Sequence, residues 1–157
     1  MMGSDHEPAE QNFVLIGGPE HPLNPGYLFP FSDGSCEYPS VEHFVNCQIL
    51  SQLNMVAEAQ QILDEETAAK ATLKTRQIIH KQIPGSHESE DWKNYLIQCR
   101  DVFTRQAVRA KLHRDAEFKS ELMSTGQSLL VFCDRGDREF GIGLDEDRFP
   151  LWARNTQ

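Results

Sequence analysis

The chain has 157 residues, of which 39% are hydrophobic and 25% charged, and its 24 acidic and 15 basic residues give a formal net charge of −9. This length suffices for one domain with a buried core, and the hydrophobic content excludes a wholly disordered chain. The acidic surplus argues against general electrostatic binding to nucleic acid. No apolar run approaches the roughly 20 residues that span a bilayer. We therefore expect a soluble, intracellular protein, cytoplasmic or nuclear.

The N-terminal quarter is expected to contain little regular structure. Residues 1–12 are polar and acidic, unlike a basic secretory leader, and are expected to form a disordered tail before a single domain over residues 13–157. A short apolar run at 13–16 predicts a strand. The Pro- and Gly-rich stretch 22–39 should be irregular, with at most one hairpin around residues 33–34.

Helical spacing of apolar residues dominates the rest of the chain. Five helices are expected: one capped by Ser40, two over 55–63 and 67–81, the longest one starting at 89–92, and a short one over 115–123 that ends at Thr125 and Gly126. A buried strand over 128–133 and a turn-rich loop over 134–143 follow. This order predicts a mainly helical α+β fold with a small sheet of short strands.

The cysteines and histidines give little sign of a metal centre. The four cysteines lie far apart in the sequence without a Cys-x-x-Cys pair, so reduced thiols are expected. His80 and His87 flank a Pro-Gly turn but have no third ligand at metal spacing. We therefore predict neither a metal nor a redox cofactor.

The segment 38–44, Tyr-Pro-Ser-Val-Glu-His-Phe, places Glu42 in the first turn of a helix. Free amides and the helix dipole hold a carboxylate ionised there, which suits stabilising a cation or orienting water. An acidic residue is also common at helix starts for purely structural reasons. His43 is more simply a structural residue.

Two further segments could bind a ligand. The loop 135–143 follows a strand and holds several charged residues, but its Gly-x-Gly lacks the rest of a dinucleotide fingerprint and also fits a hairpin. The basic segment 105–114 contains Arg105 and Arg109, which could contact phosphates or simply form a solvated helix face.

Five motifs occur in the order and spacing of one known family. They are Tyr-Pro-Ser-Val-Glu-His at 38–43, Ala-Ala-Lys at 68–70, Trp92 at a helix start, Leu-x-x-Thr-Gly at 122–126, and Asp-x-x-Phe-Gly-x-Gly at 137–143. Together they resemble the NADAR family, also called YbiA-like, over about residues 22–152. The chain differs from the family pattern at Ile49, where a lysine is usual, and at Phe140, where tryptophan is usual.

The resemblance implies a hydrolase that cleaves the N-glycosidic bond of a phosphorylated riboside, either an ADP-ribosylated guanine or a riboflavin-pathway intermediate. It implies Glu42 and Asp137 as the catalytic pair. The predicted substrate-binding residues are Asn24, Lys70, Arg76, Trp92, Arg105, Arg109, Phe140 and Gly141. Trp92 would stack on the base or sugar, although it also begins an apolar helix stripe and could be a core residue.

Two other functions remain open at this point. A non-catalytic module that binds ADP-ribose or another nucleotide is favoured by Ile49, where the family's lysine is missing. A scaffold whose acidic surface binds a protein is the third candidate. In the first two cases the expected partner is ADP-ribose or a ribosyl phosphate, free or carried on nucleic acid, and no membrane.

Overall fold

The computed structural model describes residues 12–133. Its elements are β1 (Phe13–Ile16), β2 (Phe31–Ser32), β3 (Glu37–Tyr38), α1 (Val41–Gln52), α2 (Val56–Ile62), α3 (Ala68–Gln82), the 3₁₀ turn η2 (Ser86–Glu88), α4 (Glu90–Arg114), α5 (Ala116–Ser124) and β4 (Leu129–Phe132). The predicted mainly helical α+β class and the five helices are confirmed. The expected tail, except residue 12, and the loop 134–143 lie outside the described residues.

The strands form two small sheets. β1 and β4 pair in parallel, from Phe13 opposite Leu129 to Ile16 opposite Phe132, although almost the whole described chain separates them. β2 and β3 form the expected hairpin around residues 33–34, with Phe31 opposite Tyr38. The parallel pair brings the carboxyl ends of two strands together at one edge, where ligands commonly bind in α/β sheets.

Helix α1 is the centre of the helical core. Ser40 caps it, since its Oγ accepts a hydrogen bond of 3.1 Å from the amide of His43. Residues on all of its sides are buried, including Phe44, Val45, Asn46 and Leu50, because α2, α3 and α4 pack around it. Such a helix shows no single apolar face, so its sequence period is weak.

Three of the other four helices also begin at capping side chains, whereas α2 has no side-chain cap. Thr67 caps α3, Ser89 caps α4 and Asp115 caps α5, in each case by accepting a hydrogen bond from the amide three residues later. Gly126 has the left-handed φ of 54° that ends α5 at the predicted position. These local signals account for the agreement between expected and observed helix ends.

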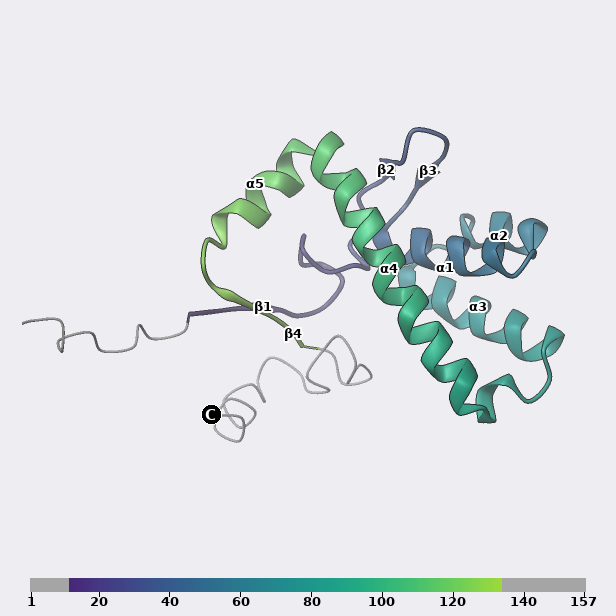
Figure 1. The fold of residues 1–157 in the computed structure, drawn as a ribbon. Coiled ribbons are helices and arrows are strands. Elements are labelled where there is room, and N and C mark those ends of the chain that lie inside the picture. The colour runs from purple at the N-terminus through teal and green to yellow at the C-terminus, as the bar shows by residue number, and fades with distance from the viewer. Residues whose placement is uncertain (1–11, 134–157) are drawn as a thin grey trace, which may run out of the picture.

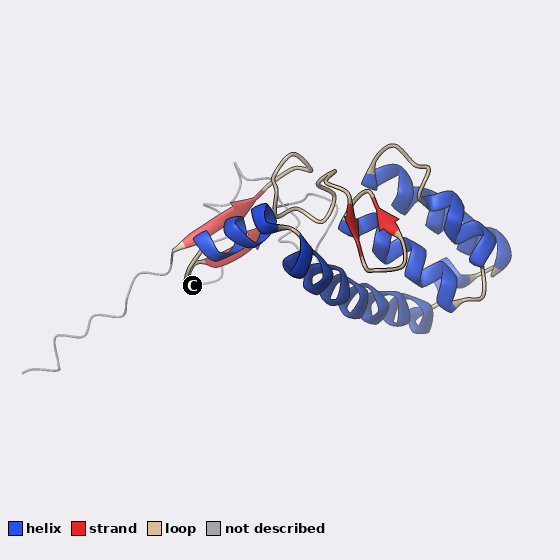
Figure 2. Ribbon diagram, turned by 90° about the horizontal axis from the view of Figure 1, so that it is seen from above, coloured by secondary structure: helices blue, strands red, loops and turns tan. Residues whose placement is uncertain are grey.

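Helix α4 connects the two halves of the described structure. Figures 1 and 2 show α1, α2 and α3 grouped along one end of α4, with the β1–β4 pair and α5 at its other end. The loop between β1 and β2 returns to the first turn of α1, where the amide of Glu42 donates a 2.9 Å hydrogen bond to the carbonyl of Pro25. No described helix is long and apolar enough to cross a membrane.

The basic segment 105–114 does not form one charged face. Lys111 is only 1% exposed, and its ammonium lies 4.6 Å from the ring centre of Phe118 and close to the rings of Tyr27 and Phe29. Burial lowers the pKa of Lys111, while Asp115 acts in the opposite direction. Lys111 therefore packs against the loop before β2 instead of facing solvent, because three aromatic rings surround its ammonium group.

Candidate functional site

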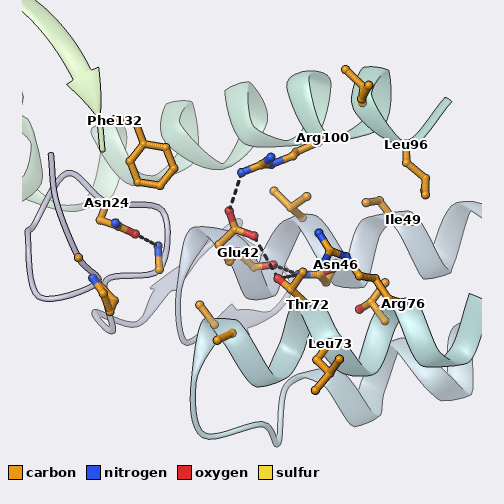
Figure 3. A pocket seen from close by; sticks show the side chains of 18 of the residues that line it. Asn24, Glu42, Asn46, Ile49, Thr72, Leu73, Arg76, Leu96, Arg100 and Phe132 are labelled. Carbon is orange, nitrogen blue, oxygen red and sulfur yellow. Dashed lines mark hydrogen bonds and ion pairs between the residues drawn. The ribbon is translucent and has the colours of Figure 1, made fainter. Parts of the chain in front are cut away.

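A pocket of about 790 Å³ opens between α1, α3, α4, the loop after β1 and the end of β4. This volume is in the usual range for small-molecule sites. Figure 3 shows Glu42 near its middle, with Asn24 and Phe132 on one side and Ile49, Leu96 and Arg76 on the other. Three helices and a strand end thus meet around one carboxylate.

Glu42 is held by partners from two other helices. Its Oε1 lies 3.8 Å from the Nη2 of Arg100 on α4, and its Oε2 accepts a 3.4 Å hydrogen bond from the Oγ1 of Thr72 on α3. The Glu42 side chain is 17% exposed, so it is largely shielded yet reaches the pocket. The guanidinium and the helix N-terminus both stabilise a negative charge at this position.

Asn46 joins the same network from one turn further along α1. Its Nδ2 donates to the backbone carbonyl of Glu42 at 2.8 Å and to the Oγ1 of Thr72 at 3.1 Å. Asn46 is buried, so these bonds lie in a region of low dielectric where hydrogen bonds are strong. The network fixes the spacing between α1 and α3 beside the carboxylate.

Asn24 organises the loop that closes one end of the pocket. Its Nδ2 donates to the carbonyl of Gly17 at 2.7 Å, and its Oδ1 accepts from the amide of Gly26 at 2.7 Å. A Cβ added at Gly26 would come within 3.1 Å of the Cβ of Ala68, so glycine allows this loop to approach α3 closely. Asn24 therefore holds the pocket wall, and direct contact with a ligand stays a prediction.

The opposite part of the pocket is largely aliphatic. Ile49, Leu73, Leu96 and Ile97 line it together with Arg76. The aliphatic walls exclude water from one face of a bound molecule, whereas Arg76 supplies charge. The pocket therefore combines a polar centre with an apolar extension.

Of the predicted site residues, the structure brings three into this pocket, Asn24, Glu42 and Arg76. Asp137, Phe140 and Gly141 lie outside the described residues. The position of the proposed second carboxylate relative to Glu42 therefore stays a prediction.

Four predicted binding residues do not line the pocket. Lys70 is exposed and pairs with Glu66 at 3.1 Å, and Arg105 is exposed and pairs with Asp101 at 3.2 Å. Arg109 is also exposed. Trp92 is half-buried against Tyr95, with ring centres 5.4 Å apart in an edge-to-face arrangement. Ligand contacts by these four residues remain predictions.

Sequence reasoning missed Arg100, Thr72, Asn46 and Phe132 as pocket residues. Helical spacing could have indicated two of them: Asn46 lies four residues after Glu42, and Thr72 lies four residues before Arg76, so each pair shares a helix face. Long-range packing brings Arg100 to Glu42 and Phe132 into the pocket, and no local signal exists for either.

Among the described residues, no group of three or more His, Cys, Asp and Glu side chains could hold a metal ion. The rings of His80 and His87 do meet edge to face, with centres 4.3 Å apart. All four cysteines are free thiols, and burial raises the pKa of Cys47 to about 12.

Comparison with known proteins identifies the family of this chain. The NADAR domain model matches residues 12–156. The chain belongs to the NADAR family. No curated protein and no solved structure matches it. The NADAR domain is associated with ADP-ribose-related N-glycosidase activity, and Glu42, at the centre of the pocket, belongs to the motif that carries the resemblance.

Proposed function

We propose that this NADAR protein hydrolyses the N-glycosidic bond between a base and a phosphorylated ribose, with ADP-ribosylated guanine or a ribosylaminopyrimidine phosphate as the substrate type. The observation that carries the proposal is the Glu42 carboxylate, which lies in the middle of a nucleotide-sized pocket and is oriented by Arg100 and Thr72. Family membership supports the class of bond.

The reaction requires a fixed anion beside C1 of the ribose. As the C1–N bond breaks, its electron pair leaves with the base nitrogen, which gains a proton, and the sugar becomes cation-like. A water oxygen then bonds to C1 and loses a proton. Glu42 suits either stabilising the cation or orienting this water, and Asp137 would take the other role or hold the ribose hydroxyls.

Base release from both substrate types tests the proposal. Glu42→Gln keeps the size and hydrogen-bonding capacity of the side chain but removes its charge, so turnover should fall about 10²–10⁴-fold while ADP-ribose still binds. Glu58→Gln, on α2 and outside the pocket, is the matched control and should retain full turnover. Full activity of Glu42→Gln would remove this residue from the mechanism.

A non-catalytic ADP-ribose-binding module is the second candidate function. It is favoured because Glu42 is the only carboxylate among the described residues that line the pocket, whereas hydrolysis of this kind usually divides acid and base work between two groups. Wild-type protein that gains thermal stability from ADP-ribose but releases no base from any N-glycoside would support this function. Absence of any nucleotide-induced shift would instead favour the scaffold.

A further inference from the structure

The basic residues of the pocket are unevenly placed. Arg100 lies beside Glu42, whereas Lys93 lies about two turns earlier on α4, roughly 10 Å along the helix. Arg76 comes from α3 and lies on the same side of Glu42 as Ile49 and Leu96 (Figure 3). Among the described lining residues, positive charge thus continues from the carboxylate toward one end of the pocket only.

Arg76 differs from the other two basic residues in its partners. Arg100 is paired with Glu42, and Lys93 with Glu90 at 3.3 Å. The part of the chain that the structure describes provides no hydrogen-bond or ion-pair partner for Arg76. A guanidinium in this state can bind a phosphate through two parallel hydrogen bonds.

The other end of the pocket has a different chemistry. Its described lining residues include Gly17, Gly18, Asn24 and Phe132, none of which is charged. A Cβ added at Gly18 would come within 2.5 Å of the carboxylate of Glu20, so an acidic group borders this end. A phosphate is therefore disfavoured here, while the Phe132 ring at the end of β4 offers a flat apolar face beside Glu42 (Figure 3).

We propose that the pocket binds its substrate in one direction, with the 5′-phosphate arm toward Arg76 and Lys93, the C1–N bond at Glu42, and the leaving base stacked on Phe132. This inference rests on the proposed function and adds to it the orientation of the substrate. It makes Phe132 the residue that selects the base and Arg76 the residue that selects a phosphorylated ribose. A planar aromatic base is required for the stacking contact.

The test compares two ligands bound to the Glu42→Gln protein, which should not consume them: ADP-ribose, which keeps its adenine but lacks the leaving guanine, and intact ADP-ribosylated guanosine. Arg76→Gln should weaken both ligands about tenfold, the loss expected for one charge-assisted contact. Phe132→Leu should leave ADP-ribose affinity unchanged and weaken only the guanine-bearing ligand by about tenfold. Phe132→Tyr, which keeps a stacking ring, should restore it.

Matched controls are Lys81→Gln, an exposed cation on α3 outside the pocket, and Phe118→Leu, an aromatic change beside Lys111. Lys81→Gln should change neither affinity, and Phe118→Leu should change the affinities for the two ligands by the same factor. Loss of ADP-ribose affinity in Phe132→Leu, or no loss in Arg76→Gln, would overturn the proposed direction. The expected pattern in a wild-type protein that hydrolyses nothing would support the direction while refuting the proposed function.

Discussion

The guanidinium of Arg100 attracts the carboxylate of Glu42 without forming a close ion pair. At 3.8 Å, the separation between Nη2 and Oε1 exceeds that of a bidentate Arg–carboxylate pair, so Arg100 acts on Glu42 mainly through its charge. In the proposed function, Arg100 is therefore a positioning residue, and Glu42 is the group that would reach the substrate.

Replacement of Arg100 tests this distinction. Arg100→Gln should lower kcat about tenfold with a smaller change in KM, because one electrostatic contact to Glu42 is lost. Arg100→Lys retains the charge and should recover most of the activity. Steady-state kinetics on a base-releasing substrate provide the measurement. An equal loss in both variants would show that the planar guanidinium, not its charge, is required.

His43 is fixed in one neutral form inside the core. Its Nε2 lies 2.9 Å from the backbone carbonyl of Glu65, which can only accept, so Nε2 carries the hydrogen. Its Nδ1, 2.7 Å from the Oγ of Ser40, then accepts from that hydroxyl. Burial lowers the pKa of His43, whereas the Glu65 carbonyl and charge act in the opposite direction.

The lowered pKa of His43 predicts a loss of stability in acid. Below the unfolded value of 6.5, the unfolded chain binds a proton that the folded chain does not, so the free energy of unfolding falls as the pH drops from about 6.5 through the folded pKa. Urea unfolding at pH 7.5 and pH 5 measures this loss. His43→Gln should be less stable at pH 7.5 and show a smaller loss between the two values. An unchanged difference would assign the acid sensitivity to other groups.

At the scale of the element, the start of α1 supports both the core and the carboxylate. The Ser40 hydroxyl caps the helix and also bonds the His43 ring, and it is fully buried. The loop between β1 and β2 also meets α1 there, because the Glu42 amide donates a hydrogen bond to the Pro25 carbonyl. A defect in this cap therefore affects the helix and the pocket together.

Ser40→Ala should lower the free energy of unfolding by about 2 kcal/mol, the upper end for cap removal, because a buried ring nitrogen also loses its donor. Thr67→Ala removes the exposed cap of α3 and should cost about 1 kcal/mol or less. Chemical denaturation of both variants gives the comparison. Equal losses would mean that the bond to His43 contributes nothing measurable.

Much of the fold could be predicted at this scale, because helix limits depend on neighbouring residues. Ser40, Ser89 and Gly126 lie where caps and stops were expected, and the hairpin around residues 33–34 follows from local turn residues. The division of the strands into two sheets instead of one could not be predicted, because pairing between strands as distant as β1 and β4 leaves no local pattern in the sequence. The same limit applies to the site: Glu42 was identified by its motif, but Arg100 depends on how α1 crosses α4.

For the whole molecule, the net charge of −9 opposes general electrostatic attraction to nucleic acid. Binding to a nucleic acid would therefore have to depend on specific contacts. If Arg76 and Lys93 make the phosphate contacts, an ADP-ribosylated single-stranded oligonucleotide should bind with a slope of log affinity against log salt of roughly −1. The unmodified oligonucleotide should bind far more weakly even at low salt. Fluorescence anisotropy over a salt series measures both. A slope several times steeper would reveal a basic surface beyond the pocket.

The parallel pairing of β1 with β4 has a consequence for the order of folding. All five helices lie between these strands in the sequence, so pairing of β1 with β4 closes a very long loop at a high cost in chain entropy. The pairing therefore adds little stability until the helices have packed. We expect the amide protons of β1 and β4 to exchange with deuterium through a partial opening that leaves α1 protected. That opening would separate Phe132 from the rest of the pocket, so a ligand that spans the pocket should slow exchange in strands at opposite ends of the described chain.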